Sequence, residues 1–297
     1  MRVFVTGATG FIGSAVVQEL ISAGHQVTGL ARTDAKAQAL SAAGASVHRG
    51  SLEDPASLRA GAAAADGVIH LAFIHTFPGF LGAPAKDERA INAMGAALEG
   101  SGKPLVVAAG VLGLKPGQLL NENDIPDYKK VPRKSEEAAR AWAARGVRGI
   151  AVRLSPTVHG EGDKGFLKMF VDIARKKKAS WYVGDGSARW PAVHRLDAAR
   201  LFRLALEKGT AGAIYHSVAD EGVPFMEIAA VLGRKLGVPL VSRSKGLGAV
   251  MAMGFLGFLA GMDSPVSSRL TQEQLGWKPE HTSLLDDLEA GHYFTGH

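Results

Sequence analysis

The first half of the chain alternates short β-branched runs with longer Ala-rich segments. This alternation is typical of repeated βα units, which build a parallel sheet with helices packed on its faces. The predicted strands are Val3–Thr6, Gln26–Ala31, Ser46–His48, Gly67–Leu71, Leu105–Ala109 and Gly149–Leu154. The predicted helices cover residues 11–23, 35–43, 55–63, 86–99 and 134–145. The pattern therefore predicts an α/β fold with a parallel sheet.

Several predicted helices carry recognisable end signals. Asp54 followed by Pro55 is typical of an N-cap and a first helical position, because proline needs no hydrogen-bond acceptor there. Gly24, Gly44 and Gly146 are expected to end their helices, since glycine readily takes the left-handed conformation that follows a helix.

The pattern changes after Pro156 to mixed short strands and helices. The stretch Asp197–Lys208 has near-helical apolar spacing, and Asp197 is expected to act as its N-cap. We therefore expect residues 1–155 to form one core, and the glycine motif described next makes this the predicted dinucleotide-binding part. Residues 156–297 are expected to form mainly a smaller substrate-binding region, with some segments returning to the core.

The clearest motif lies between the first predicted strand and the first predicted helix, and reads Thr6-Gly7-Ala8-Thr9-Gly10-Phe11-Ile12-Gly13. The first glycine of such a motif allows the sharp turn, the second lets backbone N–H groups approach a pyrophosphate, and the third lets helix and strand pack closely. The positive end of the helix then faces the phosphates. The candidate cofactor-binding residues here are Gly7, Thr9, Gly10, Phe11, Ile12 and Gly13.

This glycine motif resembles the extended and atypical short-chain dehydrogenase/reductase superfamily, which includes the NAD-dependent epimerases and dehydratases. Further similar segments are Val68–Ala72, Val152–Gly160, Gly184–Asp197 and Leu275–Pro279. The resemblance implies a Rossmann-type doubly wound parallel sheet with a smaller C-terminal substrate-binding region. It also implies that Leu71 and Ala72 lie beside the cofactor, that Pro156 and Val158 face its nicotinamide side, and that Arg189 and His194 lie on the substrate side. Arg189 is expected either to hold a substrate phosphate or to form a surface ion pair.

The residue after the second predicted strand bears on which dinucleotide binds. A free ribose 2′-hydroxyl is usually met by an acid at this place, but Arg32 stands there, and Asp34 is expected to begin the next helix. A guanidinium suits a 2′-phosphate, because it donates two charge-assisted hydrogen bonds. We expect NADP(H) rather than NAD; the alternative is that Arg32 is solvated and uninvolved.

The usual catalytic residues of the resembling family are not recognisable. That family places a Ser or Thr after the fifth strand and a Tyr-x-x-x-Lys on the next helix, where the ammonium lowers the pKa of the phenol. Here the fifth strand ends in Val107-Ala108-Ala109-Gly110-Val111, and no Tyr precedes a Lys by four residues. Tyr128 is the nearest candidate proton donor, although it also suits a loop before a helix that starts near Arg133.

Other polar side chains expected near the pocket are His75, His159, Tyr182 and His194, each of which also suits a structural role. The ten His residues have no dense ligand spacing, so no metal is expected.

The amino-acid composition limits the kinds of partner and site that the chain is expected to have. The 297 residues carry 34 Lys plus Arg and 28 Asp plus Glu, and the only dense basic run, Arg175 to Lys178, is expected to be a solvated helix end. No nucleic-acid partner is therefore expected. The absence of Cys excludes a disulfide framework, an iron–sulfur cluster and a catalytic thiol. Together with an amino terminus too short in apolar residues for a secretory signal, it favours the cytoplasm.

The longest uncharged stretch runs from Gly246 to Met262. Its 17 residues reach only the lower limit of a membrane span, so we expect a buried or pocket-lining helix and no membrane partner. It could form an apolar wall over the nicotinamide.

These features favour an NADP(H)-dependent oxidoreductase acting on a small, hydrophobic carbonyl or alcohol. The alternatives are an NADP-binding regulator or redox sensor without turnover, and a sugar-nucleotide epimerase or dehydratase. The resemblance also implies a homodimer packed through the helices near residues 86–99 and 134–145.

Overall fold

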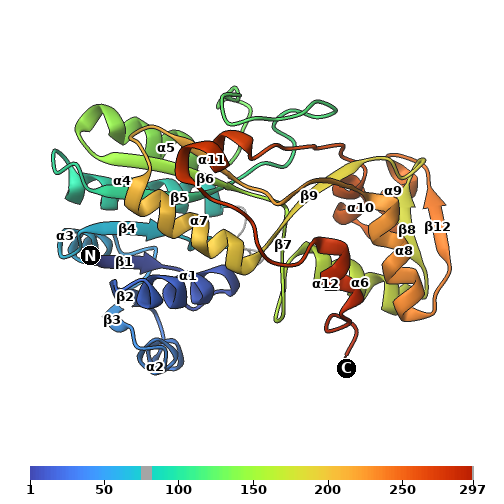
Figure 1. Cartoon of the computed structure of the whole chain (residues 1–297), viewed down its shortest axis with the longest axis horizontal. Coiled ribbons are helices and arrows are strands. Elements are labelled where there is room, and N and C mark those ends of the chain that lie inside the picture. Colours follow the sequence, from blue (N-terminus) through green and yellow to red (C-terminus); the bar gives the residue numbers. More distant parts are fainter. Residues whose placement is uncertain (75–81, 296–297) are drawn as a thin grey trace.

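The computed structural model describes residues 1–74 and 82–295, which form two lobes along one long axis (Figure 1). The larger lobe is built on a seven-stranded sheet with the strand order β10-β6-β5-β4-β1-β2-β3, and every neighbouring pair is parallel. Its strands are β1 (Arg2–Thr6), β2 (Gln26–Ala31), β3 (Ser46–Arg49), β4 (Gly67–His70), β5 (Pro104–Gly110), β6 (Arg148–Leu154) and β10 (Ile214–Ser217). The strand order reverses between β1 and β4, the point at which open α/β sheets bind ligands at their carboxyl edge.

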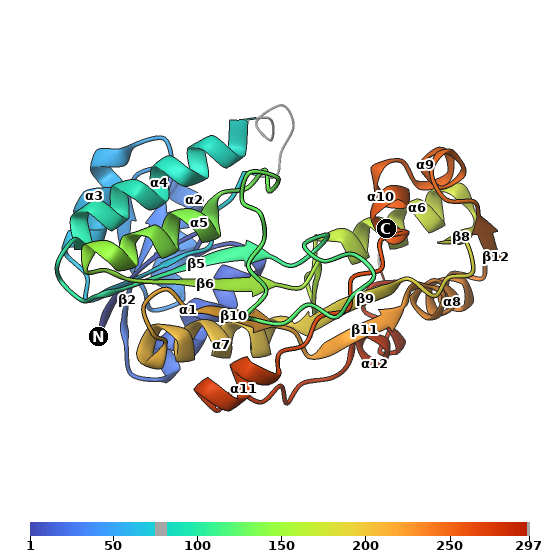
Figure 2. The same ribbon diagram turned by 90° about the horizontal axis from the view of Figure 1, so that it is seen from above.

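Helices cover both faces of this sheet. Helices α3 (Pro55–Ala63), α4 (Ala83–Leu98) and α5 (Ser135–Ala141) lie on one face, and α1 (Phe11–Ser22) and α7 (Arg195–Lys208) lie on the other (Figure 2). Helix α2 (Asp34–Ala42) packs on β2 and β3. Successive residues of β1 point to opposite faces, so Phe4 joins one hydrophobic cluster while Val3 and Val5 join the other. The predicted doubly wound α/β fold is confirmed.

Sequence patterns located the first six strands to within one residue at each end. The predicted caps are also present. The Asp54 carboxylate accepts hydrogen bonds from the backbone N–H groups of Ala56 and Ser57, and Gly24, Gly44 and Gly146 have φ values of +83°, +84° and +71°. The helix predicted over 134–145 is divided, because the α-helical α5 gives way to a 3₁₀ helix, η2 (Trp142–Arg145).

The smaller lobe has its own hydrophobic cluster around Phe170, Trp190 and Phe225, whose rings meet edge to face. Strand β9 (Arg189–His194) pairs with β7 (Thr157–His159) and β11 (Asp220–Pro224), and β8 (Ser180–Val183) pairs with β12 (Leu240–Arg243). The helices of this lobe are α6 (Phe166–Lys177), α8 (Phe225–Leu236), α9 (Leu247–Met253), α10 (Phe255–Ala260) and α12 (Leu284–Glu289). Helix α11 (Arg269–Leu275) instead packs on α7 and β10 of the larger lobe.

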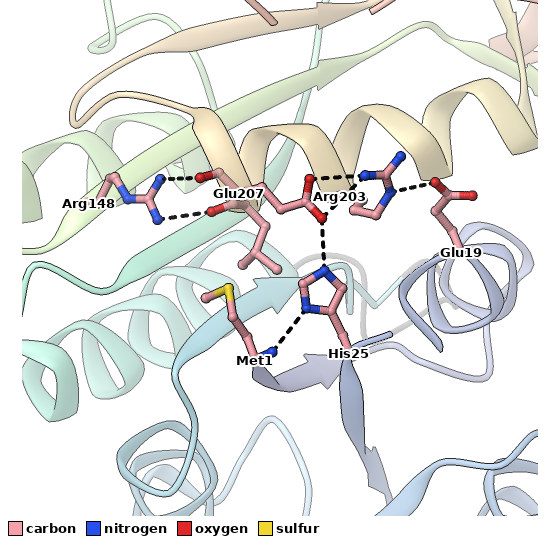
Figure 3. A network of polar contacts seen from close by, with 7 residues as sticks. Met1, Glu19, His25, Arg148, Arg203 and Glu207 are labelled. Carbon is pink, nitrogen blue, oxygen red and sulfur yellow. Dashed lines mark hydrogen bonds and ion pairs between the residues drawn. The ribbon is translucent and has the colours of Figure 1, made fainter. Parts of the chain in front are cut away.

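Helix α7 and strand β10 return to the larger lobe from the second half of the chain. Polar contacts attach α7 to the first half (Figure 3): Arg203 donates to Glu19 of α1 at 2.6 Å, and Glu207 lies 2.9 Å from Nε2 of His25. The same His25 ring lies 3.3 Å from the amino group of Met1. These contacts lie at the amino edge of the sheet, opposite the ligand edge, and help to hold α7 beside α1.

The stretch from Gly246 to Met262 differs from the single buried or pocket-lining helix expected from its sequence. Gly254, with φ +62°, divides it into α9 and α10, and each helix leaves large apolar side chains exposed. Among the described residues, no helix is long and apolar enough to cross a membrane.

Candidate functional site

The turn between β1 and α1 leaves no room for side chains at two of its glycines. Gly7 has φ +69°, and a Cβ added there would lie 2.7 Å from the backbone nitrogen of Ala72. A Cβ on Gly13 would lie 2.0 Å from the carbonyl oxygen of Gly7. Gly10 N–H donates to this same carbonyl at 2.9 Å and is the N-cap of α1. The result is a tight backbone turn at the positive end of a 12-residue helix, which fits a pyrophosphate.

Strand β4 ends directly against this turn. Leu71 N–H donates to the carbonyl of Thr6 at 3.2 Å, and Ala72 N–H lies 3.4 Å from the Thr6 hydroxyl. The structure thus places Leu71 and Ala72 beside the glycine turn. Pro156 and Val158 lie on the path from β6 into β7, where the chain passes from the larger lobe to the smaller one.

Arg32 is exposed at the end of β2 and has no hydrogen-bond or ion-pair partner among the described residues. The nearby acids are engaged: Asp34 pairs with Arg49 at 2.5 Å, and Glu53 pairs with Lys86. The pKa of Glu53 is lowered, chiefly by Lys86 and to a smaller extent by Arg32. The end of β2 therefore offers an open guanidinium and no free carboxylate, which is the environment that a phosphate favours.

The Tyr128 hydroxyl is held by two side chains of α5. It donates to Glu136 at 2.7 Å and accepts from Arg140 at 2.8 Å. Burial, followed by the Glu136 carboxylate, raises the pKa of Tyr128 to about 12. Glu136 is itself bound by Arg153 through two hydrogen bonds of 2.6 and 2.8 Å. A phenol that protonates a carbonyl needs the opposite shift, so this geometry argues against Tyr128 as the proton donor.

Arg133, which the sequence pattern did not single out, lies at the carboxyl edge just before α5. Its Nη2 donates to the carbonyl of Ala108 in β5 at 2.8 Å, and its Nε donates to Ser135 at 2.5 Å. The guanidinium lies 4.1 Å from the ring centre of Phe73, and 27% of the side chain is exposed. This is a cation fixed where the last residues of β5 meet the start of α5.

A chain of buried polar groups links Arg133 to the glycine turn. Asp87 of α4 accepts from Ser135 and lies 3.6 Å from Arg133, while Nε2 of His70 lies 3.2 Å from Asp87. The Thr6 hydroxyl lies 2.7 Å from Nδ1 of the same ring. Although burial opposes its ionisation, His70 and Arg133 keep the pKa of Asp87 below its ordinary value. An ionised Asp87 only accepts hydrogen bonds, so it fixes the orientation of both neighbours.

The proposed substrate-side residues are largely bound to protein groups. Arg189 donates to both carboxylate oxygens of Asp263 at 2.8 and 2.7 Å, which is the ion-pair alternative. His194 caps α7, where its Nδ1 accepts from Leu196 N–H at 3.3 Å. Its ring stacks on His281 at 4.8 Å, and burial above all lowers the pKa of His194 to about 4.

The prediction that Asp197 caps α7 was wrong. His194 holds that position, and the Asp197 carboxylate instead accepts from the backbone of Glu280 and His281 at 3.0 Å each. A capping interaction was expected from local sequence, but these partners lie more than eighty residues away.

The remaining polar residues expected near the pocket do not lie together in one site. His159 is buried with its Nδ1 2.9 Å from Asp287, Tyr182 lies in β8 of the smaller lobe, and His75 lies outside the described residues. Within residues 1–74 and 82–295, no group of three His, Asp or Glu side chains is arranged to hold a metal.

Comparisons with known proteins agree with this geometry. Residues 7–166 match the family model described as NAD(P)H-binding. An uncharacterized protein of Schizosaccharomyces pombe is 46% identical over 99% of this chain and 100% of its own length. The 4-hydroxy-2-methyl-3-oxo-4-farnesyl-3,4-dihydroquinoline-1-oxide ketoreductase of Stigmatella aurantiaca is 26% identical over 72% of this chain and 67% of its own.

Among solved structures, UDP-glucose 4-epimerase of Thermotoga maritima superposes with a TM-score of 0.76 at 22% identity, covering 99% of this chain and 98% of that one. At this identity the similarity concerns the fold. The distant curated relatives are reductases and dehydrogenases.

Proposed function

Since the chain belongs to the NAD(P)H-binding family within the extended short-chain dehydrogenase/reductase and epimerase/dehydratase superfamily, as its glycine motif had suggested, we propose that it is an NADP(H)-dependent oxidoreductase. Its substrate is a small, hydrophobic carbonyl compound or the corresponding alcohol. The observation that carries the proposal is the glycine turn, in which side-chain-free residues leave backbone N–H groups open at the start of α1.

Preference for NADP(H) rests on Arg32. Its guanidinium is unpartnered among the described residues, whereas Asp34 and Glu53 are both neutralised by other cations. Each charge-assisted hydrogen bond to a 2′-phosphate contributes about 1.5–3 kcal/mol, and the exposed position favours the lower end of that range. A preference for NADPH of at least about tenfold follows.

Titration of the purified protein with NADPH and NADH tests this preference. In Arg32→Asp, NADPH affinity is expected to fall at least about tenfold while NADH affinity is unchanged or improved. Arg59→Asp, an equal charge change at an exposed position of α3, is the matched control and should preserve the preference. Equal relative affinities in wild type and Arg32→Asp would refute the assignment.

NADPH supplies the hydride, and the chain must bind the substrate oxygen and stabilise its growing negative charge. We assign that second task to Arg133, because it is the cation fixed at the carboxyl end of β5, where the family normally uses hydroxyl groups. Asp87 and Ser135 hold its orientation, and 27% of its side chain is exposed. Water is the proton source in this scheme, since the Tyr128 phenol is engaged by Glu136 and Arg140.

A hydrophobic substrate is supported by the apolar contact between the lobes next to this edge. A Cβ on Gly113, just after β5, would lie 3.5 Å from the terminal methyl of Met262, and Leu112 packs on the hydrophobic cluster of the smaller lobe. The ketoreductase relative from Stigmatella is named for a substrate with a farnesyl chain, which is also hydrophobic.

A sensor without turnover is the second candidate, and the missing hydroxyl after β5 together with the engaged Tyr128 favours it. The function of a sugar-nucleotide epimerase or dehydratase has less support, because Arg189 is bound to Asp263 rather than open to a phosphate. Oxidation of NADPH should be followed against a panel of aldehydes, ketones, quinones and imines. Turnover of an apolar member supports the reductase, whereas tight NADPH binding without any turnover supports the sensor.

A further inference from the structure

Large apolar side chains gather on the outer face of α9 and α10. Leu247, Val250, Met251, Phe255 and Phe258 are exposed by 74, 41, 73, 68 and 53%, respectively. The two phenylalanine rings lie 6.3 Å apart. We call residues 247–260 the apolar hairpin. A soluble protein seldom exposes so many large apolar groups within one short segment, and such a patch marks an interaction surface.

The exposure is built into the fold of this segment. The inward faces of both helices, with Ala249, Met253 and Leu256, are buried in the hydrophobic cluster of the smaller lobe. The outward faces are apolar as well, since no residue from Gly246 to Met262 has a polar side chain. A helix at a water-facing surface normally has a polar outer side. The inward side of the hairpin is therefore buried in the smaller lobe, and its outward side presents an apolar surface to the surroundings.

Basic residues border the hairpin. Nζ of Lys177, in the last turn of α6, donates to the carbonyls of Met251 and Ala252 at 3.3 and 2.6 Å. Its neighbours Lys176 and Lys178 are exposed and have no carboxylate partner among the described residues. Arg243, at the end of β12, is also exposed without a carboxylate partner in that part of the chain. No Asp or Glu occurs from residue 228 to residue 262, and the acids on either side of the border, Asp172 and Asp263, are paired with Lys168 and Arg189.

We propose that the apolar hairpin and its basic border bind the surface of an anionic lipid bilayer. Leu247, Met251 and Phe255 would enter the boundary between headgroups and acyl chains, while the lysines and Arg243 meet the lipid phosphates. Apolar burial and attraction to anionic lipids act together at such interfaces. The hairpin lies on the membrane, because its two helices have seven and six residues and are separated at Gly254.

A second copy of this chain suits the surface less well, because a symmetric contact would bring two positive borders together. This proposal departs from the expectation of no membrane partner, which was directed at a membrane-spanning helix. It is independent of turnover, since vesicle binding is measurable without a substrate.

The test is co-sedimentation of the full chain with vesicles of pure phosphatidylcholine and with vesicles containing 30% phosphatidylglycerol. We expect binding to the anionic vesicles at least about tenfold tighter than to the neutral ones, weakening as salt rises. The double variant Met251→Ser/Phe255→Ser should lose at least about tenfold in binding, as should Lys176→Glu/Lys178→Glu. Leu119→Ser, at a leucine 50% exposed in the loop between β5 and α5, is the matched control and should bind like wild type.

Thermal unfolding and NADPH titration of every variant distinguish loss of the surface from loss of the fold. The proposal is overturned if wild type stays in the supernatant with anionic vesicles at low salt. It is equally overturned if light scattering shows a dimer that Met251→Ser/Phe255→Ser converts to monomer, because a second copy would then occupy the patch.

Discussion

The turn after β1 and the start of α5 lie at the same edge of the sheet, yet they are built in different ways. The turn depends on residues that lack side chains, since Gly7 and Gly13 leave space that backbone atoms fill. The start of α5 depends on side chains from distant segments, with Asp87, Arg133 and Ser135 meeting in one polar cluster. A backbone site tolerates almost no substitution at its glycines, whereas a side-chain site can exchange one polar group for another. A chain can therefore keep the glycine turn of its family while it lacks the family's Tyr and Lys.

The largest effect is expected at the turn. Gly13→Ala places a Cβ 2.0 Å from the Gly7 carbonyl oxygen, so the backbone must move and NADPH affinity should fall at least about a hundredfold. Gly82→Ala is the control, because no atom of the described residues lies within 4 Å of a Cβ there. Isothermal titration calorimetry measures both. Unchanged affinity in Gly13→Ala would show that the dinucleotide does not depend on this turn.

The second effect separates binding from chemistry. Arg133→Met should lower kcat about a hundredfold while NADPH affinity changes less than about threefold, because the lost interaction is with charge that develops during reaction. Arg145→Met, which removes a half-exposed arginine paired with Glu99, is the control. Steady-state kinetics with any substrate found in the panel provides the measurement. Equal kcat values for wild type and Arg133→Met would remove Arg133 from the mechanism.

The third prediction concerns the buried contact between His216 and Arg153 and the dependence of stability on pH. Burial, followed by the charge of Arg153, lowers the pKa of His216 to about 3. On acidification, the unfolded chain takes up a proton at His216 near pH 6.5, whereas the folded chain does not accept it until near pH 3. The free energy of unfolding therefore decreases as the pH is lowered through this window. Between pH 6.5 and 5 the loss from this residue is about 2 kcal/mol.

Urea unfolding at both pH values measures this loss. His216→Asn is expected to be less stable at neutral pH, because Arg153 loses a partner, but its stability should fall less steeply on acidification. The slope is thus a readout separate from the stability itself. An unchanged slope in His216→Asn would contradict the assignment.

The smallest effect is expected at Tyr128. Tyr128→Phe removes hydrogen bonds to Glu136 and Arg140 and should cost about 1–2 kcal/mol of stability, with kcat within about twofold of wild type. Thermal unfolding and kinetics on the same preparation give both values. A hundredfold loss of kcat with unchanged stability would restore Tyr128 as the proton donor.

Features that depend on neighbouring residues were predictable from the sequence. The cap at Asp54, the stops at Gly24 and Gly146, and the glycine turn all follow from local conformation, which is why the strand ends and the turn after β1 were located accurately. Binding of Arg32 to a 2′-phosphate remains a prediction.

Features that depend on distant partners were not predictable. Arg133 can be recognised as a candidate only from the folded structure, in which it contacts Asp87 of α4 and Ala108 of β5. No residue spacing in the sequence predicts these contacts. Asp197 was misjudged for the same reason, because its partners come from residues 280 and 281. The exposure of the apolar hairpin could not be predicted from its composition, since a buried helix and an exposed helix can have the same apolar residues.

The return of α7 and β10 to the large sheet has a consequence for cutting the chain. A fragment ending at Leu154 would lack β10 and so leave the edge of β6 without its hydrogen-bonding neighbour. It would also lack Leu201, Phe202 and Leu206, which fill the cluster under α1. Bare strand edges and uncovered apolar surface promote aggregation. We therefore expect residues 1–154 not to fold on their own, and fusions or split reporters should join the chain at its termini rather than between the lobes.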